Sequence, residues 1–360
     1  MHYVISYASP HGHYWYVAQV YVTLSQTVRR TNMEIVVSGI RPTGNLHLGN
    51  LYGAVVNCVK MQDEYDCRFF IADWHSLTTH SHPENIIEST YTILAEYLAC
   101  GIDPEKAIIY RQSDVPEVLE LYLYLNMNAY LGELLRTTTF KEKARKQPEN
   151  VNAGLLTYPT LMAADILLHK AVKVPVGKDQ EQNMEMARRY ARRFNNIYGV
   201  DYFIEPASFS FGSPVKIPGL DGSGKMGKSE GNAIYLIDDE KTITKKVMKA
   251  VTDSGPTEPN SAMAEPIANL FSLMKIVSEP DTYQFFLEAY NNCSVRYGDL
   301  KKQLAADIVK TTKPIRDRIL EIRGDQALLE RVAKEGADKA RETATKTIRE
   351  VRQLIGFSAK

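Results

Sequence analysis

Two kinds of hydrophobic pattern divide the chain. Up to about residue 209, short apolar runs rich in β-branched residues alternate with segments whose apolar positions recur at helical spacing. The longer segments predict helices, such as Pro83–Gly101, which has proline near its start and glycine past its end. The alternation predicts βαβ units, and hence an α/β fold built on a Rossmann-like parallel sheet with helices on both faces. The short runs predict strands at Glu34–Ile40, Cys67–Asp73, Ala107–Ser113 and Val172–Gly177.

After about Ser208 the pattern changes. A stretch rich in proline and glycine comes first, and from Asp238 onward the sequence is helical with polar faces, ending in a charged amphipathic helix at Ala337–Phe357. We therefore expect a mainly α-helical second domain. The expected divisions are an extension over 1–32 that is disordered or reflects a mis-assigned start, an α/β domain over 33–209, a helical domain over 210–325, and a C-terminal helix over 326–360 that packs back on the α/β domain.

Charge and cysteine content narrow the functional classes. In 360 residues, 43 Lys+Arg balance 43 Asp+Glu, so the chain is not a general polyanion binder and an RNA partner would need a local basic surface. No uninterrupted apolar run reaches membrane length, which favours a cytoplasmic protein without a membrane partner. The cysteines form no C-x-x-C pair, so we expect no protein-bound metal; they are Cys58, Cys67, Cys100 and Cys293.

The stretch "GLDGSGKMGKSEGNAI", Gly219–Ile234, permits two interpretations. Gly222–Ser229 matches the phosphate-binding pattern G-x-x-x-x-G-K-[ST], but it also differs by one letter from K-M-S-K-S, with Gly227 in place of serine. A P-loop needs an apolar strand before its first glycine and a helix opening at its lysine. Prolines and glycines precede this stretch and Gly-Asn follows it, so a P-loop NTPase is rejected. What remains is a glycine-rich loop with two cations, Lys225 and Lys228. This loop could close over the phosphates of a ligand, or it could be an ordinary solvated surface loop.

A second glycine-rich stretch, "SGIRPTGNLHLGN", runs from Ser38 to Asn50. It places a strand end, a turn and the start of a helix near Leu48 in succession, which is a favourable geometry for anion binding. Its glycines allow a ligand to approach the backbone closely. His47 and Asn50 bring an imidazole and an amide to the same place, so we interpret this turn as part of a nucleotide site.

Here the sequence resembles a known family. "HLGN" resembles the H-I-G-H element of class I aminoacyl-tRNA synthetases, and "KMGKS" resembles their K-M-S-K-S loop. Further segments resemble the bacterial-type tryptophanyl-tRNA synthetases, and the similarity runs from about Met33 to Phe357. The resemblance implies activation of L-tryptophan with ATP, which gives tryptophanyl-adenylate and pyrophosphate, followed by transfer to tRNA(Trp). These segments are "ADWHSLTT", "GELLRTTTFKEK", "GLLTYPTLMAADILL" and "VPVGKDQ".

The resemblance also implies the site residues. His47, Lys225 and Lys228 would be catalytic, stabilising the α-phosphate and the leaving pyrophosphate. Tryptophan would be bound by Asp165, Met162, Tyr158, Gln180, His75 and Val174. ATP would be bound by Arg41, Pro42, Thr43, Gly49, Asn50, Gly177, Lys178, Asp179, Ile217, Lys225, Met226, Gly227, Lys228 and Ser229.

Asp165 is the most informative of these positions. It interrupts the apolar helical run "LMAADILLHKA", where a carboxylate must find a donor or suffer a large desolvation cost. An ion pair would be one answer, and the resemblance implies another, the indole N–H of tryptophan. Because tryptophan has a single N–H donor and no acceptor, a fixed carboxylate would discriminate against amino acids that lack that donor, by roughly 10⁴ or more.

Two departures from the family pattern stand out. Gly227 replaces the middle serine of the lysine loop, which removes a hydroxyl and adds flexibility, and Asn50 replaces the second histidine, as is usual in the tryptophan branch. The resemblance further implies Mg²⁺ carried by the ATP, a homodimer, anticodon recognition by the helical domain, and no DNA partner. Two alternatives are a tyrosine-specific enzyme of the same architecture, disfavoured by "LMAAD", and an inactive RNA-binding paralogue, disfavoured by the retained His47, Asp165 and lysines.

Overall fold

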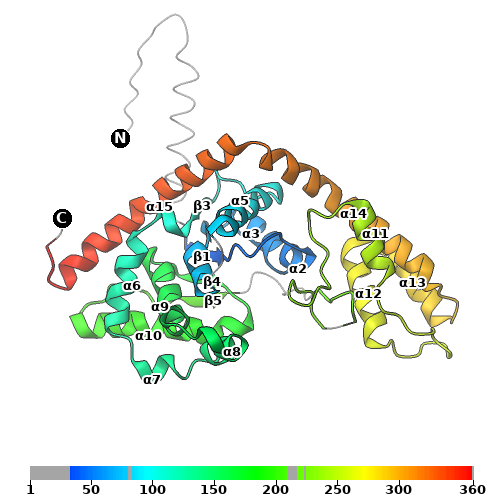
Figure 1. The fold of residues 1–360 in the computed structure, drawn as a ribbon, viewed down its shortest axis with the longest axis horizontal. Coiled ribbons are helices and arrows are strands. Elements are labelled where there is room, and N and C mark those ends of the chain that lie inside the picture. The colour runs from blue at the N-terminus through cyan, green and yellow to red at the C-terminus, as the bar shows by residue number, and fades with distance from the viewer. Residues whose placement is uncertain (1–32, 80–82, 210–216, 223, 359–360) are drawn as a thin grey trace, which may run out of the picture.

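A parallel five-stranded sheet forms the centre of the molecule in the computed structural model, which describes residues 33–79, 83–209, 217–222 and 224–358 (Figure 1). The predicted extension over 1–32 lies outside the described residues. The strand order is β3-β2-β1-β4-β5, and every neighbouring pair is parallel, which confirms the predicted α/β class. The strands are β1 (Ile35–Ile40), β2 (Asp66–Ile71), β3 (Ile108–Arg111), β4 (Lys173–Pro175) and β5 (Ala207–Phe209).

Helices cover both faces of this sheet. Successive strand residues point to opposite sides, so both faces carry apolar side chains that pack against helices. Val36 and Phe69 belong to a core that includes α5 (Pro83–Ala99), whereas Val37 and Phe70 belong to a second core. The second core contains residues of α6 (Glu117–Met127), α9 (Ala153–Leu168) and α10 (Glu181–Tyr198). Shorter helices lie at α4 (Asp73–Ser76), α7 (Leu131–Leu134) and α8 (Thr138–Lys146).

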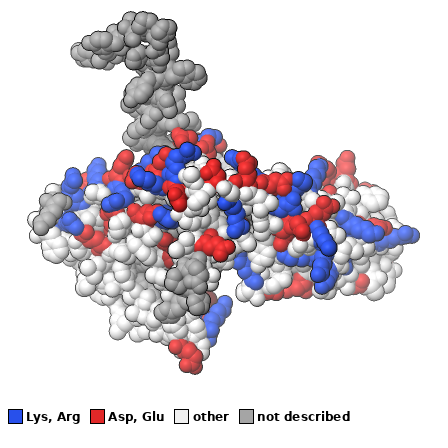
Figure 2. Space-filling model, turned by 45° about the horizontal axis from the view of Figure 1, so that its top comes forward, with Lys and Arg blue, Asp and Glu red and all other residues white. Residues whose placement is uncertain are grey.

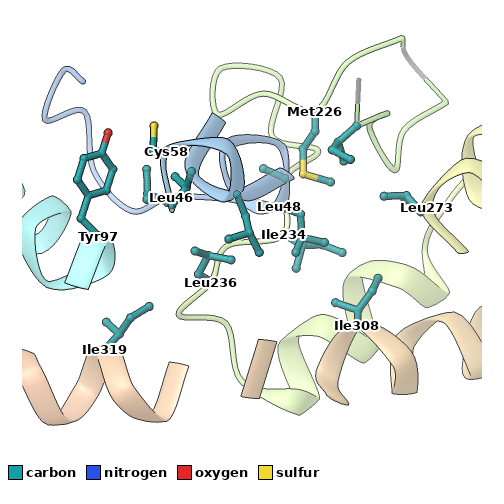
Figure 3. Packing of buried hydrophobic residues seen from close by; sticks show 14 of the residues in the cluster. Leu46, Leu48, Cys58, Tyr97, Met226, Ile234, Leu236, Leu273, Ile308 and Ile319 are labelled. Atoms are coloured by element: carbon teal, nitrogen blue, oxygen red, sulfur yellow. The ribbon is translucent and has the colours of Figure 1, made fainter. Parts of the chain in front are cut away.

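The first core continues into the helical part of the chain. Figure 1 shows this part gathered at one end of the molecule, away from α6, α9 and α10. In Figure 3, Leu48 and Met226 lie near Ile234, with Ile308 and Ile319 of α14 closing the same cluster from below. A shared hydrophobic core therefore joins the sheet to the helical part. Its helices are α11 (Glu240–Met248), α12 (Glu265–Val277), α13 (Pro280–Asn291) and α14 (Tyr297–Arg323).

Among the elements that differ from the predictions, three have a clear physical reason. The helix after the "HLGN" turn is interrupted, with α2 (Leu48–Asn50), a π-helical turn (Leu51–Val55) and α3 (Val56–Met61) in succession. Strand β5 was not predicted, because three residues are too few for a pattern to emerge. Helix α6 was not predicted either, because its exposed face also carries apolar residues and so obscures the helical periodicity.

The C-terminal helix α15 (Gln326–Leu354) runs over strand β3 and also packs on α6 (Figure 1). The approach to the strand is very close at Gly336, where a Cβ atom would lie 1.7 Å from the carbonyl oxygen of Ile109. Buried hydrogen bonds also hold α15 against the sheet. Arg68 of β2 donates to Thr343 of α15 and, over 2.9 Å, to His169 Nδ1. Only glycine permits this docked position of the helix.

We expect Gly336→Ala to destabilise the protein by about 1–3 kcal/mol, because the added methyl group meets backbone that cannot move alone. Urea unfolding measures this loss. Gly298→Ala is the matched control, since a Cβ at Gly298 of α14 meets nothing within 4 Å, and its effect is expected to stay within about 0.5 kcal/mol. Equal stabilities of the two variants would contradict the close packing of α15 on β3.

Candidate active site

A cavity of about 450 Å³ opens at the carboxyl ends of the strands. Gly39 and Ile40 at the end of β1 line it, together with Ala72 after β2 and Gly177 after β4. Parallel sheets bind ligands at this edge, where the chain leaves the strands in opposite directions. The cavity therefore lies where the topology places a ligand site.

The cavity brings together many of the residues selected from sequence. Others lie around it: Pro42, Ile217 and Met226 are buried in the surrounding structure, while Asp179, Lys225 and Ser229 are exposed. Gly49 and Gly227 are half-buried, and the side chain of Lys178 lies outside the part of the chain that the structure describes. The selected residues that line the cavity are Arg41, Thr43, Asn50, His75, Tyr158, Met162, Asp165, Val174, Gly177, Gln180 and Lys228.

Asp165 lies on α9 at the cavity wall and is only 4% exposed. His75 Nε2 donates to one of its carboxylate oxygens over 2.8 Å, and Gln112 Nε2 donates to the other over 2.7 Å. Burial raises the pKa of Asp165, and the hydrogen bonds from His75 and Gln112 oppose that rise. The protein thus supplies two donors to this carboxylate, so it is held in a defined orientation.

Gln112 was not among the residues selected from sequence. It is 1% exposed and directly follows β3, at the same sheet edge as the cavity. The sequence predicted a strand over Ala107–Ser113 that included Gln112, whereas β3 ends at Arg111, so Gln112 lies past the end of the strand, beside β2.

A second unselected residue, Lys143 of α8, approaches the cavity from outside. Its Nζ atom lies 3.7 Å from the centroid of the Tyr158 ring, a cation–π contact. Burial, and next the positive charge of Arg41, lower the pKa of Lys143 to about 8. Tyr158 in turn packs edge-to-face on His75, with ring centroids 4.6 Å apart. Two cations, Arg41 and Lys143, therefore act on the same region, which suits an anionic ligand.

The "HLGN" turn is joined by backbone hydrogen bonds to the segment that follows the lysine loop. Leu48 N–H donates to the Ile234 carbonyl over 3.0 Å, and Leu236 N–H donates to the Leu46 carbonyl over 2.9 Å. Leu46, Leu48 and Ile234 are all buried in the core shown in Figure 3. The apolar members of the motif are anchors, which leaves its polar members to act on a ligand.

His47 stands between these anchors and is 7% exposed. Burial, followed by the charges of Lys228 and Lys225, lowers the pKa of His47 to about 4. The imidazole is therefore neutral at pH 7, so it acts as a hydrogen-bonding group and not as a cation.

Lys228 is folded back onto the turn. Its Nζ atom donates to the carbonyl oxygens of Gly44 over 2.8 Å and Thr43 over 3.3 Å. Lys225 is exposed. Burial lowers the pKa of Lys228, and the carboxylate of Glu96 opposes that shift. Lys228 thus lies at the cavity, whereas Lys225 is in solvent.

Asn232 fastens the two ends of the lysine loop. Its side-chain oxygen accepts from Gly227 N–H over 2.9 Å, and its amide nitrogen donates to Asp221 Oδ1 over 2.9 Å and to the Lys225 carbonyl over 3.2 Å. At Gly227, a Cβ atom would lie 2.1 Å from Glu230 Oε2. A serine at this position would require the flexible Glu230 side chain to turn away, so the glycine accommodates this loop conformation.

Within the described residues, no group of three or more His, Cys, Asp or Glu side chains is arranged to hold a metal ion. Over the same part of the chain, none of the helices combines the length and the apolar character that a membrane span requires.

Comparison with known proteins places this geometry in context. The model of the family described as tRNA synthetases class I (W and Y) matches residues 30–313. A tryptophan–tRNA ligase of Porphyromonas gingivalis (strain ATCC BAA-308 / W83) is 74% identical over 326 residues, covering 90% of this chain and 100% of that protein.

Two solved structures are also similar. Tryptophanyl-tRNA synthetase from Campylobacter jejuni, complexed with ADP and tryptophan, has a TM-score of 0.81 and 33% identity, covering 90% of this chain and all of that one. The Mycoplasma pneumoniae tryptophanyl-tRNA synthetase has a TM-score of 0.77 and 30% identity, covering 91% of this chain and 98% of that one.

We expect Asn232→Ala to loosen the lysine loop, because it removes the bonds that tie Gly227, Lys225 and Asp221 together. The measurement is limited trypsin digestion, in which cleavage after Lys225 and Lys228 should be faster than in the wild type. Ser229→Ala is the control, since Ser229 is exposed and its hydroxyl donates to the neighbouring Glu230. Unchanged cleavage in the Asn232 variant would show that other contacts hold the loop.

Proposed function

The chain belongs to the class I tRNA synthetases for tryptophan and tyrosine, and we infer that it is a tryptophan–tRNA ligase. The observation that carries this conclusion is the 74% identity to a tryptophan–tRNA ligase along that protein's whole length. The enzyme activates L-tryptophan with ATP, releasing pyrophosphate, and transfers tryptophan from the adenylate to tRNA(Trp). The tyrosine-specific alternative is not favoured.

For the tryptophan site, we propose that Asp165 accepts the indole N–H. In support, the carboxylate is buried at the cavity wall and oriented by His75 and Gln112, and a buried carboxylate favours a ligand that brings a donor. Met162 and Val174 would pack against the indole ring, since both line the cavity. Tyr158 and Gln180 would hold the ammonium end of the amino acid.

For ATP, we propose that the nucleotide lies between the "HLGN" turn and the lysine loop. Arg41 and Thr43 line the cavity after β1, and Gly177 lines it after β4, so adenosine and phosphates can span the sheet edge. The bound ADP of the Campylobacter jejuni relative is consistent with nucleotide binding. Mg²⁺ would come with the phosphates, because the described residues offer no cluster of carboxylates for it.

The chemistry then needs positioning and charge stabilisation. The tryptophan carboxylate attacks the α-phosphorus and the bond to the bridging oxygen of pyrophosphate breaks, so negative charge moves to the leaving group. Lys228, which now binds the Gly44 carbonyl, would exchange that acceptor for phosphate oxygen, and Lys225 would follow as the loop closes. His47, being neutral, would donate a hydrogen bond to phosphate. No side chain needs to form a covalent bond.

We assign tRNA recognition to the helical part as a further proposal. Residues 210–325 would contact the anticodon, and the helix over 326–360 would fix that part against the α/β domain, since α15 reaches β3 and α6. Figure 2 shows basic and acidic side chains interspersed over the face it presents, so RNA binding would use local basic clusters and not one broad surface. Function in tRNA charging also favours a cytoplasmic location.

We propose that the enzyme is a homodimer joined through an apolar surface on α6 and α7. Leu119, Leu123 and Met127 are exposed one helical turn apart on α6. The surface continues through Tyr130, Leu131 and Leu135, which are exposed as well. A largely apolar surface of this kind suits a second copy of the chain, because obligate homodimer interfaces are more hydrophobic than transient ones.

Sedimentation analysis tests the dimer. We expect the wild type to sediment as a dimer and Leu123→Lys to sediment as a monomer, because the lysine would place an unpaired charge inside the interface. Leu320→Lys is the matched control, since Leu320 is a leucine of similar exposure on α14, and that variant should remain dimeric. A monomeric wild type would disprove the proposed assembly.

The first test of function is amino-acid-dependent exchange between ATP and pyrophosphate, with tryptophan and tyrosine assayed in parallel and without tRNA. We expect exchange with tryptophan alone, because Asp165 would accept the indole N–H while Met162 and Val174 pack against the indole ring. Exchange with tyrosine would preserve the family and overturn the assigned pocket. The absence of exchange with both amino acids, in folded protein, would favour the inactive paralogue.

Asp165→Asn is the companion variant for this assay. It preserves the size of the side chain and removes its charge, so kcat/KM for tryptophan should fall by about 10- to 100-fold, as expected for loss of a charged hydrogen-bond partner. KM for ATP should change little, since Asp165 is assigned to the amino acid. A larger effect on ATP than on tryptophan would disagree with that assignment.

A further inference from the structure

A buried carboxylate lies against the "HLGN" turn. Glu96 of α5 is 0% exposed, and its Oε2 atom accepts a hydrogen bond from Leu46 N–H over 2.8 Å. Among the described residues, its Oε1 atom has no hydrogen-bond partner. A buried, half-satisfied carboxylate destabilises a fold, and apolar residues surround this one on α5. The residue therefore calls for a role other than packing.

The groups around Glu96 indicate that role. Lys228 of the lysine loop and Arg323 at the end of α14 are the cations that act on it, and Cys100 of α5 also faces it. Burial raises the pKa of Glu96 to about 7, and the hydrogen bond from Leu46 and the two cations oppose the rise. Burial lowers the pKa of Lys228, and the negative charge of Glu96 opposes that decrease.

We propose that Glu96 is a positioning residue for the activation reaction: its carboxylate holds the Leu46 amide and keeps Lys228 charged and seated on the same turn. Lys228 donates to Thr43 and Gly44, which precede Leu46 in this turn. The Glu96 carboxylate thus joins α5 to the turn by a hydrogen bond and acts on Lys228 through its charge. The inference rests on the function assigned above and names a residue outside the cavity lining.

The proposal predicts how activity depends on pH. The ionised form of Glu96 is the working form, so kcat/KM for ATP should rise as the pH increases through about 7. Burial lowers the pKa of His47 to about 4, outside this window, whereas burial lowers the pKa of Lys143 to about 8, so loss of its charge would limit the rise at higher pH. KM for tryptophan should not follow Glu96, because the Asp165 carboxylate is held by His75 and Gln112.

Stability offers an independent readout of the same ionisation. The pKa of Glu96 is raised in the folded protein above its ordinary value of 4.5, so the folded state binds the proton more tightly than the unfolded state. The wild type should therefore lose stability relative to Glu96→Gln as the pH rises from about 4.5 to about 7. Above that window the difference should stay constant.

The decisive experiment combines Glu96→Gln with Lys228→Ala in ATP–pyrophosphate exchange from pH 6 to 8.5. At pH 8 the Glu96 variant should lose roughly 5- to 20-fold in kcat/KM for ATP, which corresponds to a typical coupling between charged neighbours. At pH 6, where most of the wild-type carboxyl is protonated, the two should differ by less than about threefold. In the Lys228→Ala background, Glu96→Gln should have little further effect, because glutamine can still accept from Leu46 N–H and the lost charge acts through the missing lysine.

Two controls separate this role from a structural one. Thr92→Val changes a buried polar residue one turn earlier on α5 and should leave the pH profile unchanged. Glu96→Leu replaces the carboxylate with an apolar side chain and serves where the glutamine variant does not fold. Wild-type exchange in all variants, or a loss that is equal at every pH and undiminished without Lys228, would overturn the proposal. Absence of exchange in the wild type would instead refute the assigned function.

Discussion

The backbone pairing between the "HLGN" turn and the segment after the lysine loop is the contact on which the active site depends. Two hydrogen bonds join Leu46 and Leu48 to Ile234 and Leu236, across a large separation in sequence. The apolar side chains of both motifs enter one core, and Met226 is buried with them. Because the anchors are fixed in this way, Asn50 and Lys228, which follow them in the two motifs, are held at the cavity. Precise placement and loop movement are therefore compatible in the same structure.

Burial then sets the chemical state of each polar group. The desolvation cost of burying Asp165 at the cavity wall is offset by hydrogen bonds from His75 and Gln112, each to one carboxylate oxygen. His47 is neutral because burial and two lysines disfavour its cationic form. Lys228 sits on carbonyl oxygens, which are acceptors that a phosphate chain can replace. Asp165, His47 and Lys228 are thus each held by contacts within the protein itself.

The residues that sequence alone identified share one property: they lie in short, unusual local patterns. The glycine-rich turn with His47, the paired lysines and the carboxylate in an apolar helix are all visible without a fold. Gln112, Lys143 and Glu96 are not, because each lies on an element whose own pattern is ordinary. Their importance comes from contacts with distant segments, such as the hydrogen bond from Leu46 to Glu96. Likewise, the close contact of Gly336 with Ile109 has no signal in the helix that contains it.

The sequence by itself determined the parallel α/β class, the family and the reaction, because hydrophobic periodicity and local motifs depend on residues that are near one another in the chain. Only the tertiary structure decided which carboxylate is held by which donors, where Lys228 rests, and how α15 closes over β3. Those outcomes depend on distances between residues far apart in sequence, and on the burial that follows. A pattern read along one chain contains neither quantity, so the electrostatic state of the site became apparent only in the folded protein.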